Sequence, residues 1–305
     1  MIDNLQGKTA VITGAASGLG LACAQLAAQH DMHLVLADVQ CDALKQVKQT
    51  LQQPHIRVMT HAVDVSDAAQ MEAFAARVAD EMGAPHWVFN NAGVASGGLV
   101  WEHSVADWQW LLGVNLWGVI HGVRLFTPMM LEAARRDPQW RGHIVNTASM
   151  AGLVTPPNMG IYNVSKHAVV SLTETLYQDL QLVTTQVGAS VLCPYFVPTG
   201  IDRSERNRPA QWQAQAPTRS QRISQAMSEK AVSSGKVSAQ EVAHKVLEAI
   251  QTDRFYIYSH PKALDAVTLR MQAMVAGENP PDPFAARPEI GAQLRAELSA
   301  ELPAS

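Results

Sequence analysis

The segment YNVSK contains a tyrosine and a lysine four residues apart, Tyr162 and Lys166. At that spacing the two side chains share one face of a helix. An unperturbed tyrosine has a pKa of about 10, and lowering it by roughly three units requires about 4 kcal/mol of differential stabilisation. A neighbouring ammonium group, together with a second positive charge nearby, could supply this stabilisation by favouring the phenolate. The pair therefore suggests an acid/base tyrosine, although the same spacing also arises in purely structural helices.

A serine ends one of the predicted strands where it could join this pair. Ser149 closes the apolar run HIVNTAS. Open α/β sheets bind ligands outside the carboxyl ends of their strands, so a hydroxyl there would point over the binding crevice. With this serine added, the catalytic interpretation of Tyr162 and Lys166 is favoured over the structural one.

Three glycines lie close together in the segment TGAASGLG, where an apolar run ends and a helical pattern begins. Gly14, Gly18 and Gly20 permit a tight turn and a close approach to the backbone. The N-terminus of the following helix presents N–H groups to a phosphate. This arrangement predicts a loop that binds a pyrophosphate. A tight strand-to-helix turn that binds no ligand is the alternative.

An acidic residue ends each of the next two predicted strands. Asp38 stands 18 residues after Gly20, near the separation at which an acid meets the ribose hydroxyls of an adenosine. An acid there repels a ribose phosphate, and neither Ser17 nor Val39 carries a positive charge, so NAD is favoured over NADP. Asp64 could accept a hydrogen bond from the adenine amino group. For both acids the alternative is a helix cap or a solvated loop position.

These residues need a scaffold in which strands alternate with helices. Short β-branched runs alternate with longer amphipathic segments along the chain. Nearly continuous apolar strands are buried on both faces, and strand–helix alternation implies right-handed crossovers in a parallel sheet. The sequence therefore predicts an α/β, doubly wound parallel sheet, the Rossmann fold. The predicted strands lie at 9–12, 33–37, 57–63, 86–89, 143–148, 189–193 and 255–258.

We expect a single domain, residues 1–260, with one long insertion and a C-terminal extension. A chain of 305 residues is at the upper edge of what one α/β domain usually holds. Residues 200–236 are polar and rich in Arg, Gln and Ser, so they form either a lid or a disordered excursion. Residues 261–305 predict a helical extension packed on or near the domain. The apolar stretch 108–123 is too short and polar for a membrane span and predicts a buried helix.

Composition narrows the classes of partner. A net charge of −4 with 16% charged residues gives no basic excess, so we expect neither a nucleic acid nor a membrane as partner. Cys23, Cys41 and Cys193 are widely spaced and lack a ligand pattern, so we expect no disulfide framework and no metal site. The segment MIDNLQGK lacks the long apolar region of a secretory signal. A small-molecule ligand and a cytoplasmic location follow as expectations.

The motifs occur in the order of a known family. TGAASGLG resembles the TGxxxGxG cofactor loop of the short-chain dehydrogenase/reductase family, and NNAG at 90–93 resembles the motif after its fourth strand. CPYFVPT at 193–199 resembles the family segment PGxVxT, with Tyr195 in place of the usual glycine. The resemblance extends from Lys8 to about Tyr258.

Four residues match the family's catalytic positions. The resemblance implies that Tyr162 exchanges a proton with the substrate oxygen while hydride passes between the carbinol carbon and nicotinamide. Ser149 would orient that oxygen. Lys166 would lower the pKa of Tyr162 and hold the nicotinamide ribose, and Asn115 in VNLWG would hold a water that links the lysine to solvent. This chemistry needs no metal.

The resemblance also implies the contacts of the cofactor. The backbone at Val197 and the side chain of Thr199 would hold the nicotinamide carboxamide. The expected set comprises Gly14, Ser17, Gly18, Leu19, Gly20, Asp38, Asp64, Val65, Asn91, Gly93, Tyr162, Lys166, Pro194, Val197 and Thr199.

The family is usually dimeric or tetrameric, so a homodimer or homotetramer is expected. Trp108, Trp110 and Trp117 lie in the segment that bears Asn115, which in the family pairs with the Tyr162 helix across a dimer interface. Core packing is the alternative for these tryptophans.

The substrate pocket is expected from loops that follow the strands. Its candidate residues are mainly apolar and indicate a bulky hydrophobic or aromatic alcohol or ketone, with ordinary packing as the alternative at each position. We expect His103 and the lid arginines, such as Arg208, at the solvated surface. The pocket candidates are Trp101, Met150, Leu153, Val154, Met159, Tyr195 and Phe196.

The predicted function is an NAD-dependent alcohol dehydrogenase or ketoreductase. The principal alternative is a non-catalytic NAD(H)-binding sensor or interaction protein on the same fold, which has no chemical need for the four catalytic-type residues. A methyltransferase would explain the glycines and Asp38 but leaves YNVSK unexplained.

Overall fold

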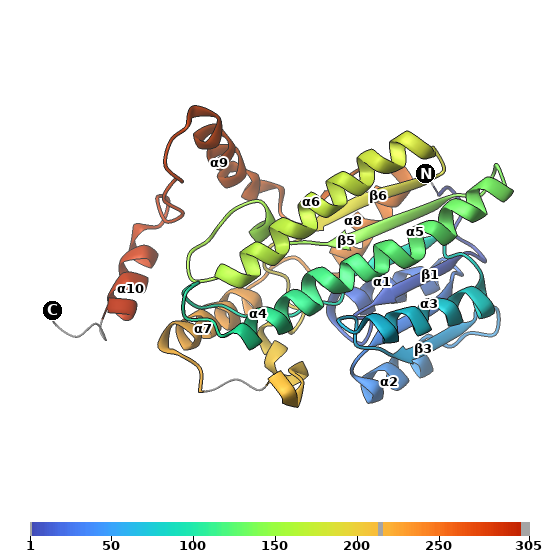
Figure 1. Ribbon diagram of the computed structural model, residues 1–305, viewed down its shortest axis with the longest axis horizontal. Coiled ribbons are helices and arrows are strands. Elements are labelled where there is room, and N and C mark those ends of the chain that lie inside the picture. Colours follow the sequence, from blue (N-terminus) through green and yellow to red (C-terminus); the bar gives the residue numbers. More distant parts are fainter. Residues whose placement is uncertain (1, 213–215, 300–305) are drawn as a thin grey trace.

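A computed structural model describes residues 2–212 and 216–299 of the chain. These residues form one sheet of seven strands in the order β3-β2-β1-β4-β5-β6-β7, and all neighbouring strands run parallel (Figure 1). The doubly wound parallel sheet is therefore confirmed. The strands are β1 Thr9–Thr13, β2 His33–Asp38, β3 Val58–Ala62, β4 Trp87–Asn90, β5 Gly142–Thr147, β6 Val187–Cys193 and β7 Tyr256–Tyr258.

The strand order reverses between β1 and β4. The chain moves outward from β1 to β3 on one side of the sheet and from β4 to β7 on the other. Strands β1 and β4 are paired in register, with Ile12 opposite Phe89. The loops that leave their carboxyl ends therefore flank one crevice, which is where such sheets bind ligands.

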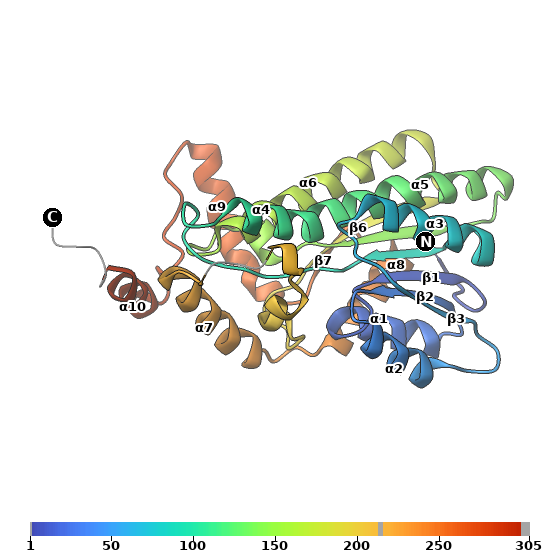
Figure 2. The same cartoon turned by 60° about the horizontal axis from the view of Figure 1, so that its bottom comes forward.

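Helices cover both faces of the sheet (Figure 2). Buried side chains of α1, α2 and α8 form a core on one face, and those of α3, α5 and α6 form a core on the other. The helices are α1 Gly18–Gln29, α2 Cys41–Leu51, α3 Ala68–Met82, α4 Val105–Leu112, α5 Gly118–Arg136, α6 Gly160–Val183, α7 Arg219–Ser233, α8 Ala239–Thr252, α9 Leu264–Ala276 and α10 Pro288–Ser299.

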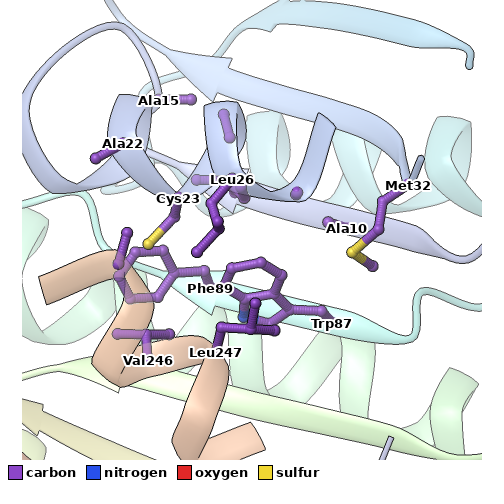
Figure 3. Packing of buried hydrophobic residues seen from close by; sticks show 14 of the residues in the cluster. Ala10, Ala15, Ala22, Cys23, Leu26, Met32, Trp87, Phe89, Val246 and Leu247 are labelled. Atoms are coloured by element: carbon purple, nitrogen blue, oxygen red, sulfur yellow. The ribbon is translucent and has the colours of Figure 1, made fainter. Parts of the chain in front are cut away.

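Strand β4 shows how the sheet divides these two cores. Trp87 and Phe89 lie on the face covered by α1 and α8, where they approach Leu26 and Leu247 (Figure 3). Val88 between them belongs to the opposite core. Because successive side chains of a strand point to opposite faces, a run of apolar residues fills both cores. Each fully buried side chain of this size contributes about 1.5–3 kcal/mol.

The predicted buried helix at 108–123 is part of a longer and interrupted one. Helix α4 ends at Leu112, a π-helical segment follows at Gly113–Trp117, and α5 continues from Gly118. π-Helical turns are rare and occur often at functional sites. Asn115 is in the middle of this segment.

The polar segment 200–236 is structured in its described part. It contains the short 3-10 helices Ile201–Asn207 and Ala210–Trp212 and then α7, which begins with a capping box formed by Thr218 and Gln221. Of the two alternatives for this segment, the described residues favour a lid over a disordered excursion.

The C-terminal extension begins with a short 3-10 helix, Pro261–Ala263, and contains α9 and α10. Leu264 and Val267 of α9 pack against the apolar cluster that contains Leu153. The rest of α9 extends away from the sheet, and α10 lies beside α7 (Figure 2). The described part of the extension therefore contains two α-helices, and 300–305 lie outside it. No helix in 2–212 or 216–299 is long and apolar enough to cross a membrane.

Candidate active site

The glycine loop crosses the carboxyl end of β1 in a conformation that requires glycine. Gly14 and Gly18 have φ angles of 65° and 54°, which L-residues with a Cβ rarely adopt. A Cβ on Gly20 would lie 2.1 Å from the carbonyl oxygen of Gly14. The loop therefore folds tightly onto the first turn of α1. A ligand bound against the loop would lie at the N-terminus of that helix.

Asp38 ends β2 and is 8% exposed. One of its carboxylate oxygens accepts the N–H of Ala16 at 2.9 Å and the other accepts the N–H of Gln40 at 3.0 Å. Asp38 thus stabilises the glycine loop and the entrance to α2 as well as lining the cavity. The capping interpretation and the binding interpretation of this residue are compatible, because a carboxylate has about four acceptor sites.

The loop after β4 is joined to the glycine loop by Asn91. Its amide nitrogen donates to the carbonyl of Thr13 at 3.1 Å, and its amide oxygen accepts the hydroxyl of Thr147 at 3.3 Å. One side chain therefore links the carboxyl ends of β1, β4 and β5. Gly93, two residues on, lies where an added Cβ would be 3.6 Å from the Lys166 ammonium nitrogen.

Asn115 is fully buried in the π-helical segment. Its Oδ1 accepts the N–H of Val94 at 2.8 Å, and its Nδ2 donates to the Val94 carbonyl at 2.9 Å and to the Ser165 hydroxyl at 3.2 Å. Both amide hydrogens are therefore engaged by protein acceptors. The side chain holds the loop after NNAG against α6, a contact that sequence reasoning did not predict.

Ser149, Tyr162 and Lys166 lie together at the carboxyl edge of the sheet and line the same cavity. Ser149 is the second residue after β5, and its Oγ accepts the N–H of Ala151 at 3.1 Å. Tyr162 and Lys166 lie on the first turns of α6, with the Lys166 Nζ 5.6 Å from the centre of the Tyr162 ring. That Nζ also donates to the carbonyl of Thr147 at 2.9 Å.

Burial dominates the ionisation of this pair in the protein itself. It lowers the pKa of Lys166 to about 8, because the ammonium group is removed from water. It also raises the pKa of Tyr162, against the opposing effect of a hydrogen bond with Ser149. The protein's own groups therefore do not produce the lowered tyrosine pKa that the sequence suggested, and that expectation depends on the positive nicotinamide.

Most of the predicted catalytic and cofactor-binding residues line one cavity. Gly20 and Asn115 are not among its described lining residues, since each lies behind the wall and supports it. Asp64 lines the cavity, and its carboxylate also accepts the N–H and hydroxyl of Ser66 at 2.9 and 2.7 Å. The predicted residues found in the lining are Gly14, Ser17, Gly18, Leu19, Asp38, Asp64, Val65, Asn91, Gly93, Ser149, Tyr162, Lys166, Pro194, Val197 and Thr199.

Two of the predicted substrate contacts lie outside the described lining of the cavity. Trp101 is 76% exposed and is not among the described residues that line the cavity, because its loop turns the ring outward. Leu153 is also missing from that lining, and it is buried instead in a core cluster with α9. Met150, Met159 and Tyr195 do line the cavity, although Tyr195 is at its rim and is 47% exposed.

Two residues expected at the surface are buried. The side chain of His103 has no exposed area, and its Nε2 has no hydrogen-bond partner among the described residues. The side chain of Arg208 is only 5% exposed and forms an ion pair with Asp107 of α4. A buried charge requires a partner, and Asp107 supplies it from a distant part of the sequence.

The substrate end of the cavity also contains residues that sequence reasoning missed. Trp110 is 3% exposed and lines the cavity, so it is neither a plain core residue nor an exposed interface residue. Most of the other lining residues at this end come from the lid and α7, and only the tertiary structure brings them beside Trp110. The other lining residues at this end are Ala95, Val114, Ile201, Ser204, Asn207, Pro209, Ser228 and Val232.

Comparisons with known proteins agree with this geometry. The family described as short chain dehydrogenase matches residues 8–210. The crystal structure of a short chain dehydrogenase/reductase from Burkholderia phymatum in complex with NAD is 50% identical, has a TM-score of 0.89, and covers 92% of this chain and 99% of that one. The CLA biosynthesis dehydrogenase/reductase of Lactiplantibacillus plantarum is 30% identical over 92% of this chain and 97% of its own. The C alpha-dehydrogenase of Sphingobium sp. is 29% identical over 96% of this chain and 94% of its own.

Proposed function

Because this chain belongs to the short-chain dehydrogenase/reductase family, we propose that it is an NAD(H)-dependent enzyme that interconverts a secondary alcohol and a ketone. One observation supports this activity above all. Ser149, Tyr162 and Lys166 line a single cavity together with the glycine loop, so a cofactor and a substrate oxygen can meet there. A protein that only sensed the cofactor would have no chemical need for this arrangement.

The residues of the cavity fit a dinucleotide. The loop from Gly14 to Gly20 leaves room for a pyrophosphate at the N-terminus of α1, and Asp38 is held where it can accept a ribose hydroxyl. Its lining neighbours Val39 and Gln40 carry no positive charge to receive a ribose phosphate, which supports NAD over NADP. The NAD complex of the 50% identical relative supports the same choice. When bound, NAD supplies the acceptor for a hydride.

The catalytic residues would act on the substrate oxygen and its proton. In alcohol oxidation, Tyr162 takes the hydroxyl proton as the carbinol C–H bond breaks and its electron pair leaves as hydride. Ser149 donates a hydrogen bond to the oxygen and holds it beside the phenol. In ketone reduction the same tyrosine returns the proton.

Lys166 and Asn115 would support this proton transfer. The Lys166 ammonium favours the phenolate and reaches the nicotinamide ribose. Asn115 has both amide hydrogens engaged, so a relay water would be held by its remaining Oδ1 lone pair or its backbone carbonyl. Val197 and Thr199, which line the cavity beyond Pro194, would hold the carboxamide.

The substrate end of the cavity favours a bulky apolar or aromatic group. Its walls include the apolar residues Trp110, Met150, Met159 and Phe196. The lid and α7 add the polar residues Ser204, Arg206, Asn207 and Ser228. Such a lining binds by apolar burial and leaves orientation to Ser149 and a small number of polar contacts.

The test is turnover across secondary alcohols and ketones graded by bulk, followed by NADH absorbance. We expect activity in the wild type and a loss of about 10²- to 10⁴-fold in Tyr162→Phe, because one proton-transfer group is removed. NADH binding, measured by fluorescence titration, should be retained in the variant. A wild type that binds NADH but turns over no member of the panel would contradict the proposal and favour the NAD(H)-binding sensor.

We also propose a homodimer or homotetramer. Trp117 on the π-helical segment and Val164 on α6 are 52% and 47% exposed, so both are available for contact with a second copy. Both lie on the sheet face covered by α5 and α6, where burial against a second copy would remove them from water. Light scattering that returned the monomer mass would refute this assembly. A cytoplasmic location stays a prediction.

A further inference from the structure

The lid is joined to α4 by a buried ion pair. Arg208 lies between the two 3-10 helices of the lid, and its guanidinium pairs with the Asp107 carboxylate. Their side chains are 5% and 6% exposed. The Nε of Arg208 also donates to the carbonyl of Trp212 within the lid. Arg208 is therefore held on one side by the lid itself and on the other by α4.

Asp107 is positioned by its own helix for this contact. Its Oδ2 accepts the N–H of Ser104 at 2.8 Å and the Ser104 hydroxyl at 2.9 Å, which completes a capping box at the start of α4. The other oxygen, Oδ1, accepts from Arg208. Burial raises the pKa of this carboxyl, but the Arg208 guanidinium and the Ser104 donors outweigh that effect and hold it below its usual value. Oδ2 therefore caps α4, while Oδ1 pairs with Arg208.

The same arginine fixes an aromatic wall of the cavity. The guanidinium carbon of Arg208 lies 4.9 Å from the ring centre of Trp110, one helical turn after Asp107. Trp110 lines the cavity and belongs to the apolar cluster that contains Tyr162, with Met159 packed against it. A planar guanidinium that stacks on the indole keeps the ring from rotating.

The lid residues on each side of Arg208 complete that wall. Asn207 and Pro209 both line the cavity. An arginine anchored by a buried ion pair therefore sets the position of its two chain neighbours as well as that of Trp110. Loss of the Asp107 carboxylate would leave the buried guanidinium with only the exposed Glu205 as a charge partner, and the lid would have to move to hydrate it.

We propose that Trp110 is a specificity-determining residue of this pocket and that Asp107 and Arg208 are positioning residues that hold it and the lid in place. The proposal rests on the dehydrogenase function proposed above. The apolar or aromatic group of the alcohol packs against Trp110, and the Asp107–Arg208 pair sets how much room that group has.

Other contacts keep the lid attached when this pair is removed. The Ser204 hydroxyl accepts the N–H of Ala95 at 2.9 Å, and the Ser220 hydroxyl donates to Glu102 at 2.6 Å. Neither contact involves Asp107 or α4. A variant of the ion pair should therefore fold and bind NADH while its pocket wall becomes loose.

Arg208 offers a matched pair of tests, because a second carboxylate contacts it at the surface. Glu205 lies 3.4 Å from its Nη1 and is 58% exposed, so the change from carboxylate to amide can be made at a buried and at an exposed partner. We expect Asp107→Asn to raise KM for the bulkiest accepted alcohol by about 10- to 100-fold. We expect kcat and NADH affinity to change by less than about threefold, and Glu205→Gln to leave all three within about twofold.

Trp110→Leu tests the specificity residue directly. The ranking of alcohols of different bulk by kcat/KM should flatten or reverse in this variant. A melting curve checks that the variant folds. Arg208→Lys keeps the charge opposite Asp107 but loses the planar stack, and it serves as the second variant if Asp107→Asn does not fold. An unchanged ranking in Trp110→Leu would overturn its role.

Hydrogen exchange gives a readout that does not need turnover. In Asp107→Asn, peptides from the described lid residues 200–212 should exchange about tenfold faster or more, while peptides covering β1 and β2 stay unchanged. Equal exchange in wild type, Asp107→Asn and Glu205→Gln would overturn the positioning role. If the wild type turns over no alcohol, the proposed function fails and the specificity role of Trp110 fails with it. Exchange still decides whether Asp107 and Arg208 hold the lid.

Discussion

The buried Lys166 should make the stability of this protein rise with pH in a specific window. Its side chain is 2% exposed, and burial lowers its pKa from 10.5 to about 8. Between these two values the folded protein has released a proton that the unfolded chain still binds. Stability rises with pH wherever the unfolded state binds more protons, so the folded state gains as pH increases through this range.

The size of the effect follows from the two pKa values. A tenfold change in an equilibrium constant is about 1.4 kcal/mol, so the full difference is worth about 3 kcal/mol. Between pH 7.5 and 9.5, where only part of the transition is sampled, Lys166 should add about 2 kcal/mol to the free energy of unfolding. The whole of this range lies below the ordinary pKa of lysine, 10.5, and Tyr162, whose pKa is raised, titrates above it.

The measurement is urea unfolding of the protein without cofactor at several pH values, for wild type and Lys166→Met. Cys23 and Cys193 act in the opposite direction, because burial raises their pKa and the unfolded chain ionises first. Cys23 is the same in both proteins and cancels in the difference. Lys166 lowers the pKa of Cys193, but burial keeps this thiol protonated in the folded protein up to pH 9.5 with or without the lysine, so its contribution cancels as well. Lys166→Met also leaves the Thr147 carbonyl without its donor. This loss lowers the free energy of unfolding equally at every pH and does not change how it varies with pH.

The difference in stability between wild type and Lys166→Met should therefore increase by about 2 kcal/mol from pH 7.5 to 9.5. Lys48→Met, at an exposed position on α2, should show a flat difference over the same range. A flat difference for Lys166→Met as well would refute the reasoning, because it would mean that burial does not lower the pKa of Lys166 in the folded protein.

Two further predictions concern the cofactor. Gly20→Ala would bring a Cβ to within 2.1 Å of the Gly14 carbonyl oxygen, so it should weaken NADH binding by at least about tenfold in a fluorescence titration, and unchanged binding would contradict the loop geometry. Asp38→Asn keeps an acceptor for the Ala16 N–H but removes the charge that repels a ribose phosphate, so the ratio of NADPH to NADH affinity should rise by about tenfold. An unchanged ratio would show that Asp38 does not set this preference.

The sheet could be predicted well because its signals are local. Each of the seven predicted strands overlaps a strand of the described structure, and the run HWVF corresponds to β4 at Trp87–Asn90. β-Branched and aromatic residues bounded by turns indicate a buried strand from a few residues of context. The glycines and Asp38 could be predicted for the same reason, since each is tied to the end of a particular strand.

The walls of the pocket could be predicted only in part. Trp101 and Trp110 are the same residue type on neighbouring segments, yet one is 76% exposed and the other is 3% exposed and lines the cavity. Their surroundings differ because the lid, more than ninety residues further along the chain, covers one and not the other. Neither the residue type nor the local hydrophobic pattern indicates which tryptophan the lid covers.

The buried arginine of the lid could not be predicted from the sequence. A polar segment with many arginines is usually solvated, and nothing near Arg208 in the sequence points to Asp107 or to a stack on Trp110. By itself, the sequence determined the alternation of strands and helices, the glycine loop, the acid after β2 and the spacing of Tyr162 and Lys166, because these depend on short-range geometry. Tertiary structure decided which charges are buried, which aromatic ring forms the pocket wall, and how far burial moves the pKa of Lys166, because each of these depends on contacts between distant segments.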